Sequence, residues 1–288
     1  MGLEVEPLQD GSIEIRPLAG SLGAEVRGLD LAAGLDREDF ATLERAFLDH
    51  LVLFFRDQVL TPAQQVAFAG RFGPIGRYPL AEPLAEHPDV IAIVKEAGQT
   101  TNFGGVWHSD TAYLEAPSLG SALYAKDVPP VGGDTLFANM YLAYESLSAG
   151  MRRMLDGLSA VNCAANAEEQ VRDGHVESGS MAGTRRDTAA MFAVHPVVRT
   201  HPGTGRKALY VNRAHTVRFK GMTEDESAGL LAYLFDHAVR EAFTCRFHWE
   251  PGSLALWDNR CTQHYPLNDY HGFRRVMHRV TIEGERPV

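Results

Sequence analysis

Short runs of alternating apolar and polar residues, separated by Gly and Pro, fill the second half of this chain and constrain its fold most. Such runs are typical of strands with one buried face. They predict strands at 119–127, 135–138, 192–200, 207–212, 243–249, 253–258 and 273–282. Two helices interrupt them, near 140–157 and 223–237, the second opened by a capping box of Thr223 and Glu226. This order argues against repeated strand–helix–strand units and favours a β-sandwich or barrel.

The first hundred residues add two helices to the predicted sheet. Asp36 is placed to cap a helix that carries Phe40, Leu43 and Phe47 on one face. A second helix begins at a capping box with Pro at its first position, TPAQ at 61–64, and runs to Phe72. Strands are predicted at 13–18, 24–31, 51–55 and 90–94, and a loop at 98–105.

Length and charge limit the class of protein. The chain has 288 residues, 45% of them apolar, which is enough for one large core, so we expect a single domain over 1–288. The net charge of −10, without a cluster of Lys and Arg, argues against a nucleic-acid partner. The polar stretch 164–190 predicts an insert or lid, or else a solvated excursion, which is the commoner role of polar loops.

Cysteine usage and the N-terminus indicate the compartment. Cys163, Cys245 and Cys261 are few, odd in number and without a CxxC pair, so we expect reduced thiols. Residues 1–17 have neither a basic start nor an apolar run, and no stretch approaches the length of a membrane span. We therefore expect a cytoplasmic protein without a membrane partner.

The segment Trp107-His108-Ser109-Asp110 carries the strongest local signal for chemistry. Residues two apart in an extended chain point to the same face, so His108 and Asp110 would present an imidazole and a carboxylate together. With a second His they would form the 2-His-1-carboxylate triad, which leaves three metal positions open. The pair alone is weak, because a chain with twelve histidines contains such pairs by chance, often at the surface.

His264 is the best candidate for the second His. It follows the apolar run 253–257, and we expect it at a strand end near the mouth of the barrel. The alternative is a satisfied polar His on a loop, and this is the commoner case for a single His.

Two arginines on the last predicted strand change that balance. Read with period two, Arg275, Met277, Arg279 and Thr281 share one face, while Arg274 lies on the other. Arg275 and Arg279 lie about 13 Å apart along a strand at the usual rise per residue. If their face is buried, each guanidinium needs an anion, because an unpaired buried charge is very costly. Internal pairing with Asp or Glu would explain one arginine more readily than both.

At these residues the chain resembles the TauD/TfdA family of 2-oxoglutarate-dependent dioxygenases. The resemblance rests on Trp107-His108-Ser109-Asp110, Gly132-Gly133-Asp134-Thr135, Trp257-Asp258-Asn259-Arg260, Thr262-Gln263-His264-Tyr265 and Arg274-Arg275-Val276-Met277-His278-Arg279. It extends from about Ile13 to Pro287 and is weakest over 164–190. It implies a mainly β fold with flanking helices around a double-stranded β-helix, the jelly-roll core of cupin-like proteins.

The resemblance also implies roles for single residues. His108, Asp110 and His264 would bind Fe(II). Arg275 would pair with the distal carboxylate of 2-oxoglutarate, with a hydrogen bond from Thr135, and Arg279 would hold an anionic group of the substrate. O₂ would then be consumed, succinate and CO₂ released, and the substrate hydroxylated. Asp110 favours hydroxylation, since related halogenases lack this carboxylate.

The chain departs from the taurine-binding members of the family at four pocket positions, Tyr78, Ala81, Gly104 and His215. Polar groups that would hold a small amino-sulfonate are missing or replaced there, and Ala81 and Gly104 leave room for a bulkier molecule. We therefore expect a small anionic substrate, a sulfonate, sulfate ester or carboxylate, and we expect taurine to be a poor one.

Two other functions remain open from the sequence. One is a cupin-type metal enzyme that does not use 2-oxoglutarate, against which the pairing of Arg275 with Thr135 argues. The other is a non-catalytic anion-binding protein of the same fold, against which an intact triad argues. Whatever its function, we expect the chain to form a homo-oligomer, a dimer or a tetramer.

Overall fold

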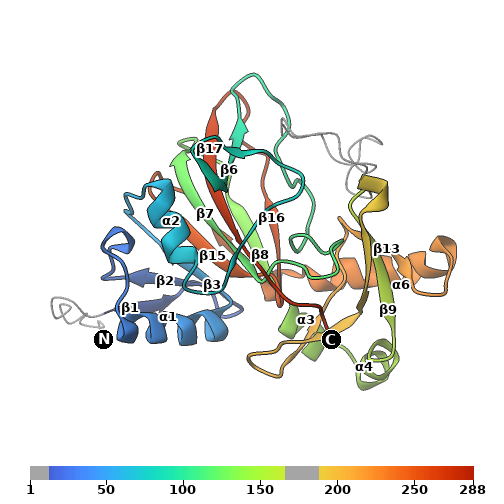
Figure 1. Cartoon of the computed structure of the whole chain (residues 1–288). Helices are drawn as coiled ribbons and strands as arrows, with labels where there is room; N and C mark the ends of the chain where they lie inside the picture. The colour runs from blue at the N-terminus through green and yellow to red at the C-terminus, as the bar shows by residue number, and fades with distance from the viewer. Residues whose placement is uncertain (1–12, 166–187) are drawn as a thin grey trace, which may run out of the picture.

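The computed structural model describes residues 13–165 and 188–288 (Figure 1). Most of the stretch 164–190, expected to be an insert or lid, lies outside these residues. The described chain is mainly β with a few helices. The helices are α1 Arg37–His50, α2 Pro62–Ala69, α3 Met140–Glu145, α4 Ala149–Leu155 and α6 Glu224–Ala238, with 3-10 turns at Leu31–Ala33, Thr188–Ala190 and Glu241–Phe243.

One large sheet forms the centre of the molecule. Its strand order is β1-β2-β3-β15-β7-β17-β6-β5, with β4 paired to β17. The strands are β1 Glu14–Pro17, β2 Ala24–Arg27, β3 Val52–Phe55, β4 Ile75–Gly76, β5 Pro83–Leu84, β6 His87–Lys95, β7 Gly120–Asp127, β15 Leu254–Asp258 and β17 Arg275–Ile282. The pairs are antiparallel except β2 with β3.

Three smaller sheets complete the described strands. The sheet β14-β8-β16 comprises Thr244–Phe247, Thr135–Asn139 and Thr262–Pro266. The sheet β10-β9-β13 comprises Phe192–Pro196, Ser159–Cys163 and Thr216–Phe219, and the pair β11-β12 comprises Val198–Thr200 and Lys207–Leu209.

The central strands are buried on both faces, which explains their continuous apolar runs. On β15, Ala255 and Trp257 enter the core shared with β8 and β14, while Leu254 and Leu256 enter the core beneath α1 and α2. Figure 1 shows α1 and α2 on the flank of the large sheet. Phe54 of β3 stacks on Phe247 of β14, with 4.0 Å between the ring centroids. The core that contains Ala255 and Trp257 therefore joins the two sheets. One face of the large sheet therefore packs toward β8 and β14, and the other packs against α1 and α2.

Helix starts agree with the sequence prediction. The side chain of Asp36 accepts hydrogen bonds from the backbone of Glu38 and Asp39 and caps α1. Capping boxes open α2 at Thr61 and α6 at Thr223. Side-chain caps of this kind satisfy backbone N–H groups that have no partner within the helix.

Several predicted boundaries were wrong. The helix expected over 140–157 is two helices, because Ser148 caps a new helix at the backbone of Met151. The strand expected over 192–200 divides at Val197, whose N–H bonds to Leu158 instead. The strand expected over 24–31 ends at Arg27, because Asp30 caps a 3-10 turn. The second helix stops at Ala69 rather than Phe72, and β9, β13 and β16 were not predicted.

The three cysteines are free thiols, as expected. Within the described residues, no helix is both long enough and apolar enough to cross a lipid bilayer.

Candidate metal centre

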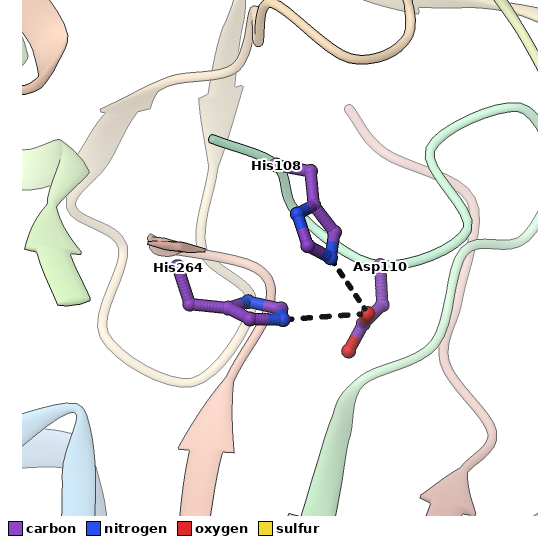
Figure 2. Close-up of side chains that lie close together, drawn as sticks. All are labelled: His108, Asp110 and His264. Carbon is purple, nitrogen blue, oxygen red and sulfur yellow. Dashed lines mark ion pairs between the residues drawn. The ribbon is translucent and has the colours of Figure 1, made fainter. Parts of the chain in front are cut away.

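The side chains of His108, Asp110 and His264 point toward one another, as Figure 2 shows. His108 pairs with His264 through two backbone hydrogen bonds, N–H of each to the carbonyl of the other, which holds the two imidazoles side by side. The Nε2 atoms of His108 and His264 lie 3.6 and 3.7 Å from Oδ1 of Asp110. His264 belongs to the middle of β16, so its expected place at a strand end was wrong.

The protonation of these groups suits a metal ion. Nδ1 of His108 lies 2.7 Å from the carbonyl of Val106, so the ring proton belongs on Nδ1 and Nε2 keeps its lone pair. Burial lowers the pKa of both His108 and His264, which favours the neutral imidazoles that bind metals. The 3.6 and 3.7 Å separations are too long for hydrogen bonds. An ion with bonds of about 2.0–2.2 Å to each atom fits between them.

Asp110 is held so that one oxygen remains free for the ion. Its Oδ2 accepts hydrogen bonds from Asn259 Nδ2 and Ser121 Oγ, both at 3.1 Å, and Nη2 of Arg279 lies 2.9 Å away. Burial alone would raise the pKa of Asp110, but the charge of Arg279 and the hydrogen bond from Asn259 oppose it, and that pKa lies well below its usual range. The carboxylate is therefore ionised, with Oδ1 turned toward the imidazoles.

Two of these supports were missed by the sequence analysis. Ser121 belongs to a strand whose residues were predicted only as sheet. Asn259 belongs to one of the motifs of the family resemblance, but no role was predicted for it. In the structure its Oδ1 accepts hydrogen bonds from the backbone of Asp110 and from the indole of Trp257. Its place directly after the buried strand β15 is the signal that could have identified it.

A cavity opens beside these three side chains. Its polar walls are His108, His264, Thr135, Arg275 and Arg279, and its apolar walls include Ile93, Leu123, Phe137 and Trp257. Polar groups that converge in an apolar cavity are typical of a small-molecule site.

Arg275 and Thr135 lie at this cavity with spare hydrogen-bonding capacity. Nε and Nη2 of Arg275 are buried and have no hydrogen-bond partner among the described residues. Burial lowers the pKa of Arg275. The indole of Trp249 donates to Oγ1 of Thr135 at 2.9 Å, which leaves the hydroxyl proton of Thr135 free to donate. Arg274 points the other way, as predicted, and pairs at the surface with Glu96 and Asp127.

Arg279 forms an ion pair with an internal carboxylate, that of Asp110. Internal pairing was the alternative that the sequence analysis left open for one of the two arginines. Even so, neither Nε nor Nη2 makes a hydrogen bond of ordinary geometry within the described chain. Arg279 also lines the cavity of the metal centre and a neighbouring one, which it shares with Tyr78 and Ala81. Its guanidinium lies 4.9 Å from the centre of the Tyr78 ring.

Gly104 and His215 lie on the His108 side of the centre. Gly104 has a φ of +77°, and a Cβ there would lie 3.0 Å from Cε1 of His108, so the position requires glycine to keep the ligand in place. The His215 ring lies 6.3 Å from that of His108 and 5.0 Å from that of Tyr113. Nδ1 of His215 and the hydroxyl of Tyr113 are buried without a hydrogen-bond partner in the described chain. The sequence analysis overlooked Tyr113.

A second buried cluster has the composition of a metal site but not its chemistry. His201, Asp258 and Cys261 also bring their ligand atoms together. Nδ1 of His201 accepts from the backbone of Gly203 and Thr204, so its Nε2 carries the proton and donates to Asp258 at 3.0 Å. Arg260 occupies both oxygens of Asp258 at 2.8 and 2.7 Å. This cluster is a closed hydrogen-bond network.

Known proteins resemble this chain along nearly its whole length. Residues 14–281 match the profile of the family described as "Taurine catabolism dioxygenase TauD, TfdA family". An alpha-ketoglutarate-dependent sulfate ester dioxygenase from Pseudomonas putida is 35% identical over 96% of this chain and 91% of its own length. An alpha-ketoglutarate-dependent 2,4-dichlorophenoxyacetate dioxygenase from Cupriavidus pinatubonensis is 34% identical over 94% and 97%. The crystal structure of a taurine dioxygenase from Burkholderia xenovorans is 37% identical and superimposes with a TM-score of 0.81, over 96% of this chain and 91% of that one.

Proposed function

The chain belongs to the TauD, TfdA family, and from that membership we propose that it hydroxylates a small organic anion other than taurine. Enzymes of this kind are oxidoreductases that depend on Fe(II), 2-oxoglutarate and O₂. The proposed substrate is a sulfonate, a sulfate ester or a carboxylate. One oxygen atom of O₂ enters the substrate, and 2-oxoglutarate leaves as succinate and CO₂.

The observation that carries this proposal is the pair of buried arginines on one face of β17. Arg275 and Arg279 both line the cavity that holds His108 and His264, and both keep guanidinium nitrogens without a hydrogen bond in the described chain. A buried guanidinium is stabilised when an anion completes its hydrogen bonds. One bound diacid cannot reach the metal ligands and satisfy both arginines, so two anionic molecules fit the site better than one.

We assign the cosubstrate to Arg275. The guanidinium of Arg275 and the free hydroxyl proton of Thr135 are donors that a carboxylate can accept, and the cavity around them has several apolar walls. His108, Asp110 and His264 would hold Fe(II), whose open positions supply the chemistry that activates O₂. The residues of the chain provide position, charge and exclusion of water.

We assign the substrate anion to Arg279. Tyr78, Ala81, Gly104 and His215 would shape its pocket, and this arrangement adds the hydroxyl of Tyr113 beside His215. A bound anion would share Arg279 with Oδ2 of Asp110, which keeps its two other hydrogen bonds. Such sharing places the substrate next to the metal ligands, where hydroxylation must occur.

Membership of the TauD, TfdA family also supports a proposal about the core of the fold. The large sheet faces β14-β8-β16 across one apolar core, which supports a double-stranded β-helix as the core of the fold. We propose that it belongs to a single domain spanning 1–288.

The test is a screen for succinate release from 2-oxoglutarate with alkyl sulfates, sulfonates, aryloxyalkanoates and acyl amino acids, with taurine as the comparison. We expect release to depend on one acidic class and to be slow with taurine. Arg279→Met should lower turnover of the accepted anion at least about thirtyfold, which corresponds to about 2 kcal/mol. Binding of 2-oxoglutarate to the Mn(II)-loaded variant should remain close to wild type.

Two results would overturn this assignment. Efficient succinate release with taurine would show that the replaced pocket residues do not exclude it. Equal loss of 2-oxoglutarate binding and substrate turnover in Arg279→Met would show that the two arginines do not divide the two anions. Metal content of each preparation serves as the control, because Arg279 also contacts a metal ligand.

A further inference from the structure

A lysine lies buried beside the proposed cosubstrate anchor. Lys95 ends β6, is only 3% exposed, and stands directly opposite Arg275 in the antiparallel pairing of β6 with β17. It occupies the same face of β6 as Ile93, two residues earlier, which lines the metal-site cavity. The side chains of Lys95 and Arg275 therefore lie next to each other on one face of the paired strands β6 and β17.

Among the described residues, no acidic side chain forms an ion pair with Lys95. Its Nζ has no hydrogen-bond partner within the described residues and lies 4.0 Å from the centre of the Tyr270 ring. The nearby carboxylates have other partners. Glu96 and Asp127 pair with Arg274 on the opposite face of the strand, and Asp134 pairs with Arg246 and His248.

The ring of Tyr270 lies close to both cations. The guanidinium of Arg275 is 5.9 Å from its centre, and the ring is itself buried. A cation over an aromatic face recovers only part of the hydration that burial removes. Two like charges in a dry pocket also repel each other. Burial, and then Arg275, lower the pKa of Lys95. The arrangement is favourable when an anion is bound nearby.

We propose that Lys95 is a second cation of the cosubstrate pocket, a positioning residue that strengthens binding of the distal carboxylate of 2-oxoglutarate through Arg275 and Tyr270. This inference rests on the proposed role of Arg275. Lys95 adds positive potential beside Arg275 at this end of the pocket. Its contribution therefore applies to dicarboxylates and not to 2-oxo acids in general.

A purely structural role makes a different prediction. If the ammonium only held Tyr270 in place, its loss would weaken the binding of every 2-oxo acid to the same extent. In that case Lys95→Arg, which keeps the positive charge, would not selectively restore the affinity for 2-oxoglutarate. The comparison of two ligands that differ only in the distal carboxylate separates the two roles.

The experiment measures binding to the full-length protein loaded with Mn(II), by titration calorimetry, with 2-oxoglutarate and with 2-oxopentanoate, which lacks the distal carboxylate. Lys95→Met should weaken 2-oxoglutarate binding about tenfold and change 2-oxopentanoate binding less than about twofold. Lys95→Arg should restore most of the lost affinity, since it restores the charge. Arg275→Met is the reference and should lose more 2-oxoglutarate affinity than Lys95→Met.

The outcomes separate the inference from its premise. If Lys95→Met loses affinity equally for both ligands, or for neither, the proposed role of Lys95 is overturned. The assignment of Arg275 still stands in that case if Arg275→Met loses 2-oxoglutarate affinity. If Arg275→Met still binds 2-oxoglutarate more tightly than 2-oxopentanoate, to the same degree as wild type, the role of Arg275 and that of Lys95 are both overturned. Thermal unfolding of Lys95→Met and Lys95→Arg checks that the variants are folded at the temperature of the titration.

Discussion

Two buried clusters in this protein combine a histidine, an aspartate and a third potential metal ligand, and they behave in opposite ways. In the first, the imidazoles of His108 and His264 stand 3.6 and 3.7 Å from Asp110, without hydrogen bonds between them. In the second, His201 donates to Asp258 at 3.0 Å and Arg260 completes the carboxylate. Residue type alone therefore does not identify a metal site.

The two clusters differ in the group that lies next to Nδ1 of His108 and of His201. Nδ1 of His108 faces a carbonyl oxygen, an acceptor, so it carries the proton and leaves a lone pair for a metal. Nδ1 of His201 faces two backbone N–H groups, which are donors, so the proton moves to Nε2 and is given to Asp258. The backbone contact at Nδ1 thus selects the tautomer, and the tautomer decides whether Nε2 has a lone pair available for a metal ion.

The largest expected effect is on the open cluster. Asp110→Ala removes the charged ligand and leaves two neutral imidazoles, so Fe(II) retention should fall and turnover should drop by roughly a thousandfold or more, about 4 kcal/mol on the barrier. Succinate release and metal content per chain measure this. The fold should persist, and unchanged turnover would refute the assignment.

The matched change in the closed cluster should affect stability instead. Asp258→Ala leaves the proton of His201 and the charge of Arg260 buried without a partner, so the free energy of unfolding should fall by about 3–5 kcal/mol. Urea denaturation measures it. Mn(II) affinity of the folded protein should stay near wild type, and its loss would show that the clusters are not independent.

Asn259 connects the clusters and offers an intermediate effect. It follows Asp258 in sequence, yet its amide holds Oδ2 of Asp110. Asn259→Ala should weaken Mn(II) binding about tenfold to a hundredfold, because a ligand loses the group that orients it. Ser121→Ala, which removes a different donor to the same oxygen, is the comparison. Unchanged metal affinity in both variants would mean that Asp110 is held by Arg279 alone.

Acid sensitivity gives the smallest effect. Burial alone would raise the pKa of Asp258, but Arg260 and His201 hold it below its usual range. The unfolded chain therefore takes up a proton first, at a pKa of about 3.9, so the contribution is complete above that value and is lost as pH falls further. In Asp258→Asn the unfolding free energy should fall less steeply below pH 5, by at most about 1.4 kcal/mol per pH unit. Parallel curves for the two proteins would contradict this.

Local patterns in the sequence predicted much of the frame, and the family resemblance singled out the three side chains that converge at the candidate metal centre. Alternation on the last strand separated Arg275 from Arg274, and the burial of the first and exposure of the second agree. Caps at Asp36 and Thr223 are likewise set by residues within three positions.

Other features depend on contacts that no local pattern contains. The pairing of His108 with His264 joins chain segments 156 positions apart, so the central place of His264 in β16 was not predictable from its neighbours. The contact of Arg279 with Asp110 and the isolation of Lys95 likewise arise only when β17 is placed against β6 and the loop after Val106. Strands β9 and β13 lack strong alternation and form because they pair with each other.

The most direct test of the contrast between the clusters is an anomalous diffraction map from a crystal of the full-length protein soaked with Mn(II) and 2-oxoglutarate. We expect a strong peak between Nε2 of His108, Nε2 of His264 and Oδ1 of Asp110, and none between His201 and Asp258. A peak at the second cluster, or no peak at the first, would contradict the account.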